Sequence, residues 1–235
     1  MRTLILNVLC EGQTEEVFVK EVLRPYLMDR EIVVKHRLLL TSRKQNAQGG
    51  MLSYQQAKRD LTLWMKEVSR KRNEVHYFTT MFDLYALPDD FPGYAESLNT
   101  SDAYKKVEKI EDALYGDIRQ PRFIPYIQLH EFEALLFCDL DKLKKDYPKS
   151  AGNIDKLKSV LPSHHDNPEL INSNPNTAPS KRIIKVMEDS GYNYNKPRGA
   201  SVTKWIGIDN LTAKCQHFKE WIDKLKNIAM EGDVK

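Results

Sequence analysis

The first sixteen residues constrain the fold more than any other part of the chain. Residues 4–10 form an apolar run without polar alternation, and it is far shorter than the roughly 20 residues of a membrane-spanning helix. Such a run is typical of a parallel strand that is buried on both faces. Glu11 follows it directly, and Gly12 marks a turn before Thr14, a candidate helix N-cap. The stretch therefore predicts a strand, a turn and a helix, with Glu11 at the strand end where open α/β sheets place their ligands.

Strand-like and helix-like segments alternate after this start. Apolar patterning predicts helices at 14–28, 52–72 and 101–115, and strands at 31–40, 74–82 and 123–129. Pro25 is expected to kink or end the first helix. This alternation indicates an α/β fold, with a mostly parallel sheet flanked by helices. We expect two parts, an α/β core at 1–140 and a helical, loop-rich C-terminal extension at 141–235 that packs on it.

Composition excludes several classes of protein. The chain has 235 residues, 41% apolar and 29% charged, with a net charge of +3, which is typical of a globular protein and does not by itself indicate nucleic-acid binding. Three cysteines without a CxxC pair argue against a disulfide framework or a zinc ribbon. The sequence shows neither a signal-peptide pattern nor a membrane span, so we expect a cytoplasmic protein without membrane contact.

Acidic side chains follow three of the predicted strands. Glu11 follows the first strand, Asp83 the third, and Glu131 and Glu133 the fourth. Because the carboxyl ends of parallel strands lie along one edge of a sheet, these side chains are expected to converge. Clustered carboxylates repel unless a cation lies among them, and an oxygen-only set favours Mg²⁺ or Mn²⁺. Such sites perform phosphodiester chemistry, although each acid alone is equally explained as a cap or a surface charge.

Glu15 and Glu16 lie in the first turn of the predicted first helix. Negative charge there is favoured by the helix dipole, and this alone explains both residues. Glu15 also lies about one helical turn beyond Glu11, so the two could address neighbouring metal ions.

Basic residues gather in a few segments that are expected to be exposed. The loop at 41–50 carries Arg43 and Lys44 and is either simply solvated or contacts phosphate. Further basic residues could complete a rim that binds a nucleic-acid backbone, or remain ordinary solvated side chains: Lys181, Arg182, Lys196, Arg198 and Lys204.

Four spaced motifs carry a family resemblance. Residues 10–16 (CEGQTEE), 82–93 (FDLYALP followed by FPG), 126–137 (YIQLHEFEALLF) and 177–182 (TAPSKR) together resemble the bacterial DUF4276 family. That family is similar to a branch of the Toprim fold and, within it, to nucleases of the overcoming-lysogenization-defect type. The resemblance implies a Toprim-like or Rossmann-like core that binds Mg²⁺ or Mn²⁺.

The resemblance also assigns roles to particular residues. Glu11 and Glu15 match the paired glutamates of those nucleases, Asp83 the first acid of the Asp-x-Asp motif, and Lys181 the lysine that completes the site. Glu131 and Glu133 match the acid-x-Glu motif, so these five acids are the implied metal ligands. One position departs from the pattern, because Tyr85 stands where the second Asp is expected. Tyr85 either orients a metal-bound water or packs beneath the following segment.

His130 precedes the acid-x-Glu motif and has two interpretations. It could take part in proton transfer, or it could be a hydrogen-bonded structural group.

The expected function is that of a metal-dependent nuclease acting on DNA or RNA. The resemblance implies a role in bacterial anti-phage defence with a partner ATPase; the sequence has no P-loop, so ATP hydrolysis would come from another chain. Two alternatives remain open at this point. One is a non-catalytic Toprim-like regulatory or interaction subunit, and the other is a small-nucleotide phosphohydrolase.

Overall fold

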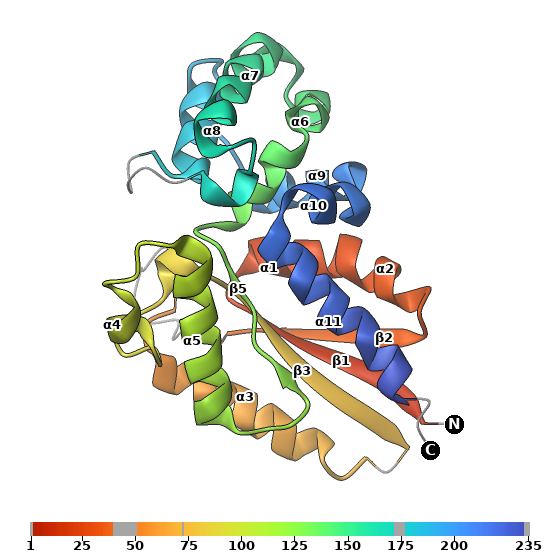
Figure 1. Ribbon diagram of the computed structural model, residues 1–235. Helices are drawn as coiled ribbons and strands as arrows, with labels where there is room; N and C mark the ends of the chain where they lie inside the picture. Colours follow the sequence, from red (N-terminus) through yellow and green to blue (C-terminus); the bar gives the residue numbers. More distant parts are fainter. Residues whose placement is uncertain (1, 40–50, 72, 172–176, 233–235) are drawn as a thin grey trace.

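Five strands of the described residues form one parallel arrangement (Figure 1). The computed structural model describes residues 2–39, 51–71, 73–171 and 177–232. The strands are β1 (Thr3–Cys10), β2 (Ile32–Leu38), β3 (Glu74–Asp83), β4 (Phe123–Ile124) and β5 (Ile127–Gln128). Their order is β2-β1-β3-β4, and β5 pairs with the end of β3. The two neighbours of β1 are both parallel to it, as its continuous apolar run predicts.

Helices connect and cover the strands. The first half contains α1 (Gln13–Phe18), α2 (Arg24–Met28), α3 (Tyr54–Val68), α4 (Tyr94–Ser97) and α5 (Ala103–Ile118). The second half contains α6 (Leu140–Asp146), α7 (Ala151–Leu157), α8 (Pro179–Glu188), α9 (Lys196–Ile206), α10 (Ile208–Lys214) and α11 (Gln216–Gly232). Short 3₁₀ segments follow β3 at Leu84–Ala86 and β5 at Phe132–Cys138. The predicted α/β class, with a mostly parallel sheet and C-terminal helices, is confirmed.

The two faces of the sheet belong to two hydrophobic cores. Leu6 and Val8 of β1 belong to the core that includes Phe18 and Trp221, whereas Leu9 belongs to the core that includes Trp64. Alternate residues of a strand point to opposite faces. The α1 and α11 side chains therefore cover one face, and those of α3 and α5 cover the other.

The predicted fourth strand is interrupted. Residues 123–129 pair with β3 only through β4 and β5, on either side of Pro125. Proline has no backbone N–H to donate to a ladder, so it breaks the strand. Thr80 bridges the break, because its Oγ1 accepts from Tyr126 N at 3.0 Å and donates to Tyr126 O at 2.9 Å. The prediction of one continuous strand at 123–129 was therefore wrong.

The first helix changes its winding instead of ending at Pro25. A π-helical segment, Val19–Leu23, joins α1 to α2, and Pro25 lies in the first turn of α2. The helix is continuous at this point, because Arg24 N donates to Val19 O, and only Pro25 has no N–H to donate.

The helices after residue 140 form an upper group and a lower group (Figure 1). The upper group, α6 to α8, lies beyond the carboxyl ends of the strands, and α9 and α10 lie between it and the sheet; α11 returns along the sheet. Trp221 of α11 stacks on Tyr126 with ring centroids 4.1 Å apart, and its Nε1 donates to Thr79 Oγ1 at 2.9 Å. The division at residue 140 stays a prediction, although one hydrophobic core runs through both parts.

The basic loop predicted at 41–50, with Arg43 and Lys44, lies outside the described residues. Among the helices that are described, none is long and apolar enough to cross a membrane.

Candidate functional site

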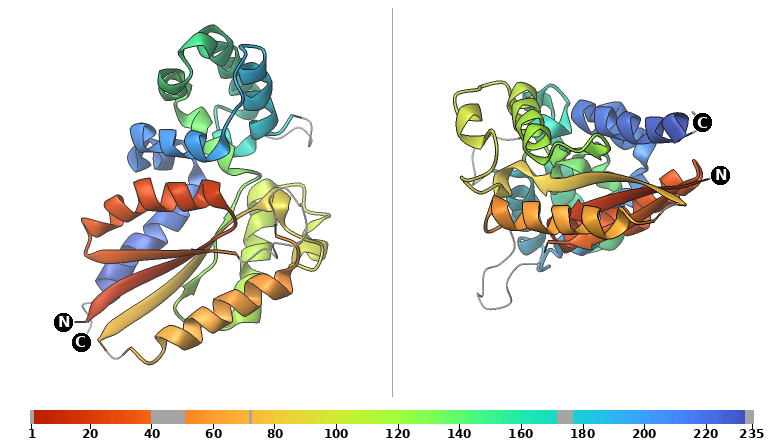
Figure 2. Two further views of the ribbon diagram at one scale, coloured as in Figure 1. Left: turned by 180° about the vertical axis from the view of Figure 1, so that it is seen from behind. Right: turned by 90° about the horizontal axis from the view of Figure 1, so that it is seen from below.

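A cavity of about 1000 Å³ opens at the carboxyl ends of the strands. The ends of β1 and β3 contribute Glu11 and Asp83 to its wall, and the first turn of α1 contributes Glu15. The helical region contributes Lys181, at the start of α8, and Lys196, at the start of α9, to the wall of the same cavity. The rear view in Figure 2 shows the helical group standing over this end of the sheet.

Glu11 and Asp83 are held by successive backbone hydrogen bonds. Glu11 Oε2 accepts from the backbone N of Asp83 at 2.9 Å. Asp83 Oδ1 accepts from the backbone N of Phe132 at 3.0 Å. Each bond engages one of the two carboxylate oxygens and ties the end of one strand to the next. These two hydrogen bonds therefore link the carboxyl ends of β1 and β3 to the segment after β5.

Glu15 closes the turn between β1 and α1. Its Oε2 accepts from the backbone N of Gly12 at 2.8 Å, and the side chain is 5% exposed. The carboxylate of Glu15 thus caps the start of α1, whose N-cap is Gly12; the prediction of Thr14 as the N-cap was wrong. It also lies within electrostatic range of Glu11 and Asp83, so it belongs to the same acidic group.

Glu133 is fully buried and faces a lysine. Its side chain is 1% exposed, and Lys196 Nζ lies 3.4 Å from each carboxylate oxygen. Oε1 of Glu133 has no hydrogen-bond partner among the described residues. A buried carboxylate oxygen in this state carries a desolvation cost that a proton or a cation would relieve.

Glu131 is engaged differently from the other acids. Its Oε2 accepts from Ser180 N at 3.0 Å and its Oε1 from Ser180 Oγ at 3.1 Å. Ser180 lies in the first turn of α8, so Glu131 anchors the start of this helix. Both carboxylate oxygens of Glu131 therefore already accept a hydrogen bond from Ser180, unlike those of the acids near Asp83.

The acids raise one another's pKa. Burial, followed by the charge of Glu15, raises the pKa of Glu11 to about 7. Burial also raises the pKa of Glu133 to about 7, against the opposing charge of Lys196. The pKa of Asp83 is raised well above its usual value by burial and then by Glu15, Glu11 and Glu133. A group of carboxyls with this coupling takes up protons or a cation readily.

Lys196 balances part of this charge. Burial alone would lower its pKa, but Glu133, Asp83 and Glu131 together raise it, so the ammonium stays charged. Lys181 lines the same cavity, at the position expected from the sequence.

His130 packs against Tyr85. It is 6% exposed, and its ring lies against the Tyr85 ring in a tilted arrangement, with the centroids 5.2 Å apart. Burial, with smaller effects of Lys106 and His164, lowers the pKa of His130 to about 4, so the imidazole is neutral at pH 7.

A model of the family described as a domain of unknown function, DUF4276, matches residues 10–226. The chain belongs to the DUF4276 family. The match confirms the family that the four motifs predict, and it covers every site residue named above. No curated protein and no solved structure gives a significant match to this DUF4276 protein.

The donor chemistry of the DUF4276 site suits a hard divalent cation. Its acids offer oxygen atoms only, which is the ligand type that Mg²⁺ and Mn²⁺ prefer. Within the part of the chain that the structure describes, no three acidic, histidine or cysteine side chains are already placed to hold one ion. Oε1 of Glu133, which accepts no hydrogen bond from the described residues, and the raised pKa values of Glu11 and Asp83 nevertheless fit a site that gains from a cation. Ion binding would require these side chains to move closer together.

The sequence predicts Lys196 only as one of several basic residues that could bind a nucleic-acid backbone, and not as a partner of the acidic group. A signal was available, because Asn195 and Pro197 mark a helix start, and Asn195 Oδ1 does accept from Arg198 N at 2.8 Å. A lysine in the first turn of a helix opposes the helix dipole. Such a residue is expected to have a carboxylate partner elsewhere, and here that partner is Glu133.

Proposed function

We propose that this DUF4276 protein is a metal-dependent nuclease that hydrolyses phosphodiester bonds of DNA or RNA. The observation that carries the proposal is the acidic group Glu11, Glu15, Asp83 and Glu133, whose charges act on one another. The first three of these residues line a large cavity, and Glu133 is buried behind them. The relation of the family to Toprim nucleases is part of this proposal.

Each residue has a proposed role. Glu11, Asp83 and Glu133 would hold Mg²⁺ or Mn²⁺, and Glu15 would bind a second ion or orient its water. The ion would supply charge neutralisation at the phosphate and an activated water. Lys196 and Lys181 would offset the phosphate charge from the opposite wall. The resemblance implies that Glu131 is a metal ligand as well, but its hydrogen bonds to Ser180 favour a role in positioning α8.

The biological setting is proposed from the family resemblance alone. We propose that the protein acts in the cytoplasm, in anti-phage defence, with an ATPase as its partner chain.

Hydrolysis assays with matched variants test the proposal. Purified protein is incubated with single-stranded DNA, duplex DNA, RNA and mononucleotides in Mn²⁺, in Mg²⁺ and in EDTA. We expect Mn²⁺-dependent cleavage that falls by about 100-fold or more in Glu11→Gln, because a metal-binding charge is lost. Glu16→Gln is the control, since Glu16 pairs with Lys20 and His36 outside the cavity. Cleavage that survives Glu11→Gln would contradict the proposed site.

Two observations favour the non-catalytic alternative. Tyr85 replaces the second acid of the Toprim motif, and the described acids hold no ready-made set of three ligands. A regulatory or interaction subunit would bind Mn²⁺ or its partner without turnover on any substrate, including when the ATPase is supplied. Turnover of mononucleotides alone would instead identify a small-nucleotide phosphohydrolase.

A further inference from the structure

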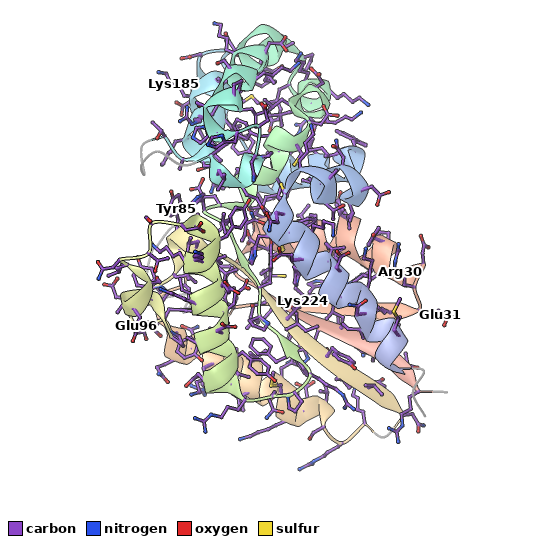
Figure 3. All side chains as sticks on the ribbon, in the orientation of Figure 1. Arg30, Glu31, Tyr85, Glu96, Lys185 and Lys224 are labelled. Atoms are coloured by element: carbon purple, nitrogen blue, oxygen red, sulfur yellow. The ribbon has the colours of Figure 1, made fainter. Side chains whose placement is uncertain are left out.

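Tyr85 is an exposed aromatic residue at the wall of the acidic cavity. It lies in the 3₁₀ segment that follows β3, two residues after Asp83. Its side chain is 40% exposed, whereas Leu84 and Leu87 on either side are 5% and 6% exposed. Figure 3 shows Tyr85 where the α4–α5 side of the sheet layer faces the upper helices. Single exposed aromatics are common on protein surfaces, so its surroundings decide whether this one has a function.

The ring of Tyr85 is held in place from below. Its backbone N donates to His130 O at 3.1 Å, and its ring lies 5.2 Å from the His130 ring at an interplanar angle of 30°. His130 is buried and has a φ of +62°, a conformation that residues other than glycine rarely adopt. Backbone and ring contacts to a buried residue make Tyr85 a fixed platform instead of a freely rotating surface side chain.

The cavity wall combines this platform with groups suited to a phosphate. Lys181 and Lys196 line the same cavity as Tyr85, and so do Glu11 and Asp83. Proteins that bind single-stranded nucleic acid combine cationic side chains along the backbone with aromatic rings on which bases stack. In a closed duplex the bases are stacked on one another, so a protein ring reaches a base face only where a strand is open.

We propose that an unpaired nucleobase stacks on Tyr85, so that the site takes single-stranded nucleic acid in preference to closed duplex. This inference rests on the proposed function, since it assumes that a nucleic-acid phosphate enters the cavity. It also gives a reason for an aromatic residue at the position where the Toprim motif has a second acid. Tyr85 is thereby a binding residue for the base, while Glu11 and Asp83 face the phosphate.

Equilibrium binding to matched oligonucleotides tests the stacking. A single-stranded oligonucleotide containing 2-aminopurine is compared with an abasic strand and a blunt duplex of equal length, in Ca²⁺ to limit cleavage. We expect Tyr85→Ala to weaken binding of the base-bearing strand about tenfold and to leave the abasic strand and duplex within about twofold. Tyr85→Phe keeps the ring and should bind as the wild type does. The 2-aminopurine emission should be quenched by the wild type and Tyr85→Phe, but not by Tyr85→Ala.

Tyr115→Ala is the matched control, because Tyr115 is 44% exposed on α5 and does not line the cavity. Circular dichroism checks that each variant is folded. Equal losses for base-bearing and abasic strands, or no loss in Tyr85→Ala, would overturn the stacking role. Failure of the wild type to bind any base-bearing strand would overturn it as well.

A separate assay distinguishes this inference from the proposed function. The substrate bis(p-nitrophenyl) phosphate contains no nucleobase. Loss of its Mn²⁺-dependent hydrolysis in Glu11→Gln would therefore support the nuclease site independently of any stacking on Tyr85. If nucleobases stack on Tyr85 but no phosphodiester is hydrolysed, the stacking inference holds and the proposed nuclease function does not; the protein would then only bind nucleic acid.

Discussion

Burial of Glu133 lowers the stability of the fold and also gives the acidic group one of its members. Its carboxyl is buried, has one oxygen without a hydrogen bond from the described residues, and pairs with Lys196 at 3.4 Å. The sequence predicts that Glu133 belongs to an acidic group, since it follows a strand in an acid-x-Glu pattern. Its burial and its pairing with Lys196 could not be predicted, because they depend on where α9 packs more than sixty residues later.

The pH dependence of stability follows from the pKa of Glu133. That pKa is raised to about 7, so between about pH 4.5 and pH 7 the folded protein retains a proton that the unfolded chain releases. The contribution of Glu133 is therefore present at low pH and is lost as the pH rises through 7. Relative to the wild type, Glu133→Gln should gain about 3 kcal/mol in unfolding free energy between pH 5 and pH 8.

Urea unfolding in EDTA at pH 5, 6, 7 and 8 measures this difference. Glu16→Gln is the control, because the hydrogen bond to Lys20 lowers the pKa of Glu16, and its contribution is lost only as the pH falls below that range. A difference between Glu133→Gln and the wild type that stays constant from pH 5 to pH 8 would show that the carboxyl of Glu133 is not shifted.

Secondary-structure elements were predictable where apolar patterns are long. The buried run of β1 and the amphipathic α3 appear where their residues predict, because each makes its own pattern of burial. The segment at 123–129 has the composition of a strand, but Pro125 interrupts its pairing with β3. Helix winding was also beyond prediction, since the π-helical turn before Pro25 leaves no mark in the apolar pattern.

Thr80 should contribute measurably to the interrupted strand. Thr80→Val removes the hydroxyl that bonds both N and O of Tyr126, and the buried backbone groups would lose their partner. We expect a loss of about 1–3 kcal/mol in unfolding free energy, measured by urea titration with circular dichroism. Thr62→Val is the control, because Thr62 Oγ1 donates to Lys58 O in the half-exposed α3, and its cost should stay within about 0.5 kcal/mol. Equal costs for the two variants would contradict the bridging role.

At the scale of the whole molecule, the two predicted parts share one hydrophobic core. Residues of β1 and α1 pack with Trp221, Phe218 and Leu225 of α11. The sequence predicts that the C-terminal helices pack on the α/β part, but not that the last helix covers a face of the sheet. A strand buried on both faces requires two covering layers, and the pattern does not say which helix supplies the second.

The fragment 1–140 is therefore expected not to fold alone. Without α11 the sheet would expose Tyr126 and the face of β3 that carries Thr79. We expect a non-cooperative urea transition for 1–140 by circular dichroism, and a cooperative transition when the fragment is mixed with residues 141–235. A cooperative transition for 1–140 alone would show that the core at 1–140 is an independent domain.

The three tryptophans of the chain lie in three different surroundings. Trp64 of α3 is buried in one hydrophobic core, and Trp221 of α11 is buried in the other. Trp205 is 39% exposed and lies beside Lys145 and Lys204. Each indole should therefore emit with its own spectrum, blue-shifted for the two buried rings and red-shifted for the exposed one. Proteins that retain one tryptophan at a time would let light emission follow the opening of each face of the sheet separately.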